Sequence, residues 1–118
     1  MGTFAVEIGV ASLDRREYRT IEAMVDTGAT YVTLPTPLLR DIGVTPHERY
    51  SFILANGSHI EQDVGRAWVR LDGREEITIV VFGAEGAPAL LGAVALESLG
   101  LAVDPVAKRL LPVPGYLL

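Results

Sequence analysis

The chain has 118 residues, 49% of them apolar, and carries a formal net charge of −5 at pH 7. This length predicts one domain over residues 1–118 with a core of its own. The acidic balance argues against nucleic acid as a partner, and the absence of cysteine excludes disulfides and cysteine-based metal sites or nucleophiles. Neither a signal-peptide pattern nor a run of the roughly 20 apolar residues that cross a bilayer occurs, so we expect a cytoplasmic protein without a membrane partner.

The first predicted elements are strands. Residues 3–11 alternate apolar and polar side chains, and residues 19–25 form the return strand of a hairpin. Residues 31–35 predict a short strand that ends at a proline. Residues 36–43 predict little more than one helical turn, with Thr36 at the N-cap.

Two dipeptides predict hairpin turns in the middle of the chain. Asn56-Gly57 and Asp72-Gly73 are typical of turns whose two central positions have positive φ. Gly65 predicts a bulge or a close backbone approach. The turns divide this segment into three predicted strands, at about residues 49–55, 59–71 and 75–82.

The last part of the chain predicts a loop, a short apolar strand, a helix and two more strands. The helix covers residues 92–100, with Val94, Leu96 and Leu99 near one face and a glycine at its end. Two final strands flank Asp104-Pro105. Since no alternation of strands and helices indicates a parallel sheet, the predicted fold class is all-β with one short helix in the C-terminal half.

Asp26 occupies an unusual place, because it ends an apolar run and is followed at once by Thr27 and Gly28. A carboxylate beside apolar residues needs a shifted pKa, a partner or a function. Each half of the chain leads from a strand through a glycine turn into an apolar segment and a helix. Two similar halves are expected to bring their glycine turns together near a pseudo-twofold axis.

Three stretches together resemble the retropepsin-like aspartic proteases, the single-lobed clan of retroviral proteases and their bacterial relatives. They are AMVDTGAT at residues 23–30, the hairpin at residues 52–69, and Leu90-Leu91-Gly92 before the late helix. The resemblance covers nearly the whole chain in order. It implies a closed-barrel-like retropepsin (acid protease) fold, of the bacterial branch. The chain carries a single Asp-Thr-Gly, so the second catalytic aspartate is expected from a second copy in a symmetric homodimer.

The resemblance also implies an activity. It is that of an aspartic endopeptidase, in which two Asp26 carboxylates, one from each subunit, share a proton and activate a water molecule without a cofactor or metal. Thr27 is expected to bond across the twofold axis, and Gly28 to place its N–H near the carboxylates. The predicted substrate is an extended peptide or protein. The residues predicted to bind it are Ala29, Ile53, Leu54, Ala55, Asn56, Gly57 and Val81, with Val32, Leu34 and Ile60 as further candidates.

Several alternatives stay open. A non-catalytic, dimeric peptide-binding or assembly module would keep the same fold, and the hairpin would then need no role as a lid. The apolar chain ends, residues 3–10 and 109–118, either form the dimer sheet or are an ordinary core strand and a loose tail. Ser58 and His59 are adjacent on a strand and therefore point to opposite faces, which disfavours a serine hydrolase.

Other residues carry weaker signals. His47 and His59 have no cysteine or other metal-ligand motif near them in the sequence, which disfavours a metal site. Residues 83–88 lack the Gly-Lys-Ser/Thr ending of a phosphate-binding loop. Trp68 is predicted to be a core or interface residue.

Overall fold

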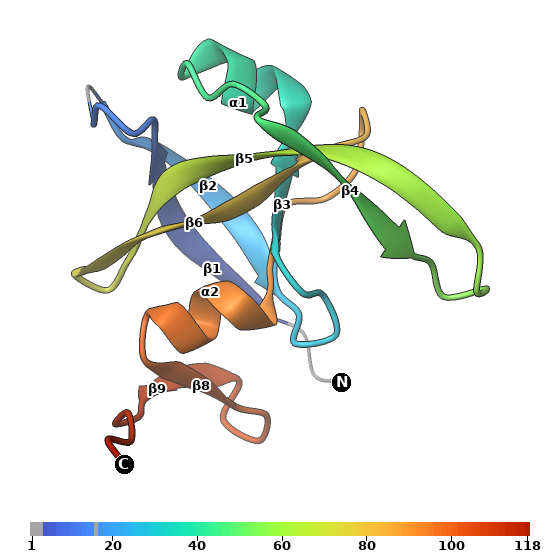
Figure 1. Cartoon of the computed structure of the whole chain (residues 1–118). Helices are drawn as coiled ribbons and strands as arrows, with labels where there is room; N and C mark the ends of the chain where they lie inside the picture. The colour runs from blue at the N-terminus through green and yellow to red at the C-terminus, as the bar shows by residue number, and fades with distance from the viewer. Residues whose placement is uncertain (1–3, 16) are drawn as a thin grey trace.

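The computed structural model describes residues 4–15 and 17–118. These residues form mostly strands, with two short helices (Figure 1). The elements are β1 (Phe4–Ala11), β2 (Arg19–Val25), β3 (Val32–Pro35), α1 (Thr36–Asp41), β4 (Glu48–Ile53), β5 (His59–Leu71), β6 (Arg74–Gly83), β7 (Leu90–Leu91), α2 (Ala93–Ser98), β8 (Leu101–Asp104) and β9 (Arg109–Pro112).

The main sheet closes on itself. Its strands follow the order β1-β2-β7-β3-β6-β5-β4, and a further pairing between β1 and β5 joins the two sides. Strand β4 lies outside this closure, on the free edge of β5, so the β4–β5 hairpin projects from the barrel (Figure 1). The predicted all-β, closed-barrel-like fold is confirmed.

The barrel is filled by apolar side chains from nearly every strand. In β1, Ile8 and Val10 are buried, while Phe4 and Val6 are half-buried and pack against the core. This alternation is the one that residues 3–11 predicted. Strand β1 is a core strand of the chain, since it pairs with β2 along its length and with β5 at its end. The alternative, that this segment forms the dimer sheet, stays a prediction.

The two predicted hairpin turns differ. Asp72 and Gly73 both have positive φ, 52° and 77°, as a two-residue turn requires. In the other hairpin only Gly57 has positive φ (85°), and its N–H donates to the Leu54 carbonyl while Leu54 N–H donates to Ser58. The predicted two-residue turn is therefore wrong here, and the loop has three residues with the glycine in the left-handed position.

Helix α1 begins one residue earlier than predicted. Pro35 is its N-cap, and Thr36 is its first helical residue, whose hydroxyl donates to the Gly83 carbonyl at 2.7 Å. The predicted N-cap role of Thr36 is wrong because this bond to the end of β6 takes the hydroxyl. The close approach predicted at Gly65 is confirmed, since a Cβ there would lie 2.8 Å from the Thr45 carbonyl oxygen.

Helix α2 packs one side on the barrel. Ala95, Leu96 and Leu99 are buried, whereas Val94 is 36% exposed. The prediction that Val94 shares one face with Leu96 and Leu99 is wrong, because positions 95, 96 and 99 form the stripe that a helix of 3.6 residues per turn presents to one side. Gly100 follows with φ of 69°, as predicted for the residue after a helix.

The C-terminal segment forms its own two-stranded sheet, β8 and β9, beneath α2 in Figure 1. The Val113 N–H donates to the Gly100 carbonyl, and the Arg74 side chain donates to the carbonyl of Leu99 at the end of α2. Leu111 and Val113 are 36% and 43% exposed. The sequence had predicted these two strands, and among the described residues β9 pairs only with β8.

Five side chains fasten the β1–β2 turn to the outer face of β5 and β6. Arg15 Nη2 lies 2.6 Å from both carboxylate oxygens of Glu75, and the Arg15 guanidinium lies 4.3 Å from the centroid of the Trp68 ring. The Tyr18 hydroxyl donates to Glu75 at 2.7 Å, and Arg70 lies 4.0 Å over the Tyr18 ring. Trp68 is thus a half-buried member of an ion-pair and cation–π cluster on the outside of the sheet.

Candidate active site

Asp26 lies in the loop that follows β2, where the strand leaves the sheet. Its side chain is half-buried, and its Oδ1 accepts a hydrogen bond of 2.9 Å from the Gly28 N–H. Its own backbone N–H donates to the Leu91 carbonyl at 3.0 Å, and its carbonyl accepts from Ala29 at 3.1 Å. The loop therefore fixes the carboxylate through its backbone while leaving Oδ2 without a hydrogen bond from the described residues.

Gly92 supports this loop from behind. A Cβ at position 92 would lie 2.5 Å from the Tyr31 carbonyl oxygen and 2.8 Å from that of Ala29, so only glycine allows the two segments to approach this closely. The first two N–H groups of α2, those of Ala93 and Val94, donate to the carbonyls of Ala29 and Thr30 at 2.8 and 2.9 Å. This contact joins the glycine turns of the two halves, as the internal similarity predicted.

A hollow of about 320 Å³ adjoins the Asp26 loop and extends under the β4–β5 hairpin. We call it the loop–hairpin pocket. It is built by the loop after β2, both strands of the hairpin, the end of β6 and the loop that follows β6. Its lining residues are Gly28, Ala29, Thr30, Tyr31, Thr33, Phe52, Ile53, Ile60, Gln62, Val81, Gly83, Ala84 and Ala87.

Three aromatic rings connect the loop to the hairpin. The Tyr31 ring centroid lies 5.9 Å from that of Tyr50 and 6.2 Å from that of Phe52, and the latter two are 6.4 Å apart. We call these residues the aromatic cluster. The sequence predictions missed all three, although residues 50 and 52 alternate with polar Ser51 and so share one face of a strand.

The predicted substrate-binding residues divide into two groups. Ala29, Ile53, Ile60 and Val81 line the loop–hairpin pocket, next to Gly28 of the predicted catalytic trio. The remaining predicted residues, Leu54 to Gly57, form the turn of the hairpin. They are exposed and do not line the pocket. Thr27 is exposed in the loop.

Two of the further candidates are wrong. Val32 and Leu34 are fully buried and belong to the hydrophobic core. They alternate on β3 with Thr33, whose side of the strand faces the pocket. The prediction chose the apolar face of β3, but in a filled barrel that face packs inward.

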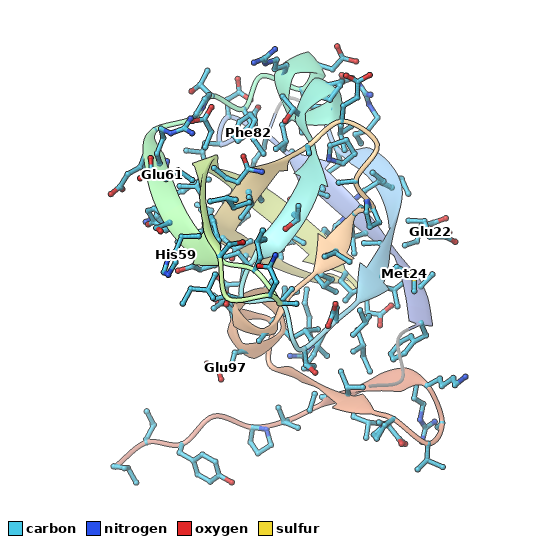
Figure 2. All side chains as sticks on the ribbon, turned by 90° about the vertical axis from the view of Figure 1, so that its right-hand side faces the viewer. Glu22, Met24, His59, Glu61, Phe82 and Glu97 are labelled. Atoms are coloured by element: carbon cyan, nitrogen blue, oxygen red, sulfur yellow. The ribbon has the colours of Figure 1, made fainter. Side chains whose placement is uncertain are left out.

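The two histidines lie on the surface. His47 and His59 are exposed, and Figure 2 shows His59 and Glu61 pointing outward from the β4–β5 hairpin. Within the described part of the chain, no group of three or more His, Asp or Glu side chains gathers in a way that would hold a metal ion. Over the same residues, none of the helices has the length and apolarity needed to cross a membrane.

Solved structures share this architecture. The chain superposes on EIAV protease in complex with the inhibitor HBY-793 with a TM-score of 0.62 at 18% identity, covering 82% of this chain and 88% of that one. For the simian foamy virus (mac) protease the TM-score is 0.59 at 21% identity, covering 81% and 94%. The Legionella pneumophila protein Lpg0085, of unknown function, gives 0.55 at 20% identity, covering 91% and 92%. These likenesses show a retropepsin fold.

A family model describes the same relationship in sequence. No curated protein matches the chain significantly. The model of the gag-polyprotein putative aspartyl proteases matches residues 16–98, a span that includes the Asp26 loop, the β4–β5 hairpin and Gly92. The chain therefore belongs to the family of gag-polyprotein putative aspartyl proteases, within the retropepsin-like group.

Proposed function

We propose that the protein is an aspartic endopeptidase, a single retropepsin-like domain whose active site forms when two copies bring their Asp26 carboxylates together. The observation that supports this most is the carboxylate at the end of β2, held by the Gly28 N–H and bordered by the loop–hairpin pocket. A purely structural turn acid has no need of a substrate-sized hollow beside it.

In the proposed reaction the two Asp26 carboxylates share one proton, because like charges at close range disfavour double ionisation. The ionised carboxylate removes a proton from a water molecule, whose oxygen attacks the carbonyl carbon of the peptide bond. The protonated carboxyl donates its proton to the carbonyl oxygen. Collapse of the resulting diol breaks the C–N bond as the nitrogen receives a proton. Neither a metal nor a cofactor takes part.

The proposed roles of the remaining residues follow from their places. Gly28 orients the Asp26 carboxylate through its N–H, and the Thr27 hydroxyl bonds to the partner's loop. The hairpin turn, Leu54 to Gly57, closes over an extended peptide whose backbone pairs with the hairpin strands.

Among the described residues, one edge of β9 has no partner strand. This edge and the exposed Leu111 and Val113 support the β8–β9 sheet as part of the dimer interface. A cytoplasmic location belongs to the proposal, and the absence of cysteine is compatible with a reducing compartment.

The test compares wild type with Asp26→Asn and, as a control, with Asp41→Asn, which alters an exposed acid on α1. Each protein is mixed with a peptide library from about pH 3 to about pH 8, a range that covers carboxylate titration. We expect cleavage by wild type and by Asp41→Asn, and none by folded Asp26→Asn. Specific activity should rise with protein concentration as dimers form.

Two results would contradict the proposal. Cleavage that persists in Asp26→Asn would assign the activity to other residues or to a contaminant. A folded wild-type dimer that binds peptides but cleaves none at any pH would instead favour the non-catalytic binding module.

A further inference from the structure

The loop–hairpin pocket differs from the hollows beside it in charge. None of the described residues that line it is charged. The adjoining hollow along β4 includes Arg49, and the one toward α1 includes Arg40 and Glu85. A charged substrate side chain in the loop–hairpin pocket would lose water without gaining an ion pair, so the pocket favours a neutral one.

The aromatic cluster supplies one wall of this pocket. Tyr31 and Phe52 both line it, with their rings nearly perpendicular (86°) and 6.2 Å apart, while Tyr50 supports the pair from the adjoining hollow. Aromatic pairs prefer centroid separations of about 4.5–7 Å in offset or edge-to-face arrangements, so an aromatic side chain that enters the pocket gains a ring–ring contact with this wall. An aliphatic side chain of the same size makes only the apolar contact.

Small residues also line the pocket, and they leave room for such a ring. Gly28, Ala29, Gly83, Ala84 and Ala87 all line the pocket. Its volume of about 320 Å³ is about twice that of a cavity of roughly 150 Å³ that binds benzene.

We propose that the loop–hairpin pocket selects an aromatic side chain, phenylalanine or tyrosine, of the bound peptide, and that Phe52 and Tyr31 are the residues that determine this specificity. The proposal rests on the peptide hydrolysis proposed above, since it names the substrate class of the same site. Because Gly28 and Ala29 line the pocket, the selected side chain lies close to the bond that is cleaved.

The experiment uses the full chain and sets of octapeptides that carry, at one position at a time, phenylalanine, cyclohexylalanine or leucine. Cyclohexylalanine matches phenylalanine in size but has no π-system. Binding is measured on Asp26→Asn and cleavage on wild type. We expect one position at which phenylalanine is preferred over cyclohexylalanine by about threefold to tenfold in Kd and in kcat/KM.

Three variants test the assignment of the wall. Phe52→Leu keeps an apolar side chain at this position and should reduce the preference for phenylalanine to less than about twofold. Ala84→Leu, in an exposed loop position, narrows the pocket. It should weaken the binding of phenylalanine-containing peptides more than the binding of peptides with smaller side chains. Ile77→Ala removes an apolar side chain that is 43% exposed on β6 and lies outside the pocket, and it should leave the preference for phenylalanine unchanged.

Several outcomes would overturn the inference: equal affinity for phenylalanine and cyclohexylalanine at every position, a preference that survives Phe52→Leu, or no binding of any peptide set. The two proposals fail separately. Aromatic preference in binding without cleavage would refute the hydrolysis and support the pocket assignment. Cleavage without aromatic preference would support the hydrolysis and refute the pocket assignment.

Discussion

Replacing Gly92 by alanine tests the contact that supports the Asp26 loop. The added methyl group would lie 2.5 Å from the Tyr31 carbonyl oxygen and 2.8 Å from the Ala29 carbonyl oxygen, both of them backbone atoms that cannot rotate away. Overpacking of this kind costs roughly 1–3 kcal/mol, and separating the segments weakens one or two backbone hydrogen bonds worth about 1 kcal/mol each. We therefore expect a loss of roughly 2–5 kcal/mol in the free energy of unfolding.

Thermal and urea unfolding at one fixed protein concentration measure this loss, since dimerisation makes stability depend on concentration. For a chain of this length the thermal midpoint should fall by roughly 8–20 °C. The control is Gly115→Ala, where an added methyl group meets nothing within 4 Å, and its midpoint should stay within about 2 °C of wild type. If Gly92→Ala unfolds like the control, the two segments do not approach as closely as described, and Gly92 has no special role in holding the loop.

Two further predictions concern charges on the barrel surface. Glu7 and Glu22 are directly opposite each other on β1 and β2, so Glu22→Arg should stabilise the protein by about 0.2–1 kcal/mol in urea unfolding, and a loss of stability would show that the two carboxylates do not repel. Hydrogen bonds from Tyr18 and Arg15 lower the pKa of Glu75 from its ordinary value of 4.5. The Glu75 carboxylate therefore contributes fully to the stability of the fold above its ordinary pKa, and this contribution is lost as the pH falls through the lower, folded-state pKa. Glu75→Gln should consequently unfold at a lower temperature than wild type at neutral pH, with a difference that shrinks in acid, and a difference independent of pH would argue against the ion pair as its cause.

Much of the fold could be predicted because its signals are local. Alternation of apolar residues identified β1 and β2, and Asp72-Gly73 identified a turn whose geometry depends on those two residues alone. The Asp26 loop was predictable for the same reason, since strand, carboxylate and glycine are consecutive. The N-cap role of Thr36 and the helix face of Val94 were predicted wrongly, because each depends on a segment that is distant in sequence. The Thr36 hydroxyl bonds to the end of β6, and the buried face of α2 is set by its packing on the barrel wall.

The loop–hairpin pocket could be predicted only in part, and the turn at Gly57 shows why. A two-residue turn at Asn56-Gly57 would place Phe52 opposite Glu61, whereas the three-residue loop in the structure places Phe52 opposite Ile60. A shift of one residue exchanges the faces of a strand relative to its neighbour. The predicted turn would therefore have brought a carboxylate beside Phe52, on the side of the hairpin where the structure has an apolar, charge-free wall. The neutral character of the pocket depends on one residue of loop length, and that length is a property of the folded hairpin rather than of the Asn-Gly signal.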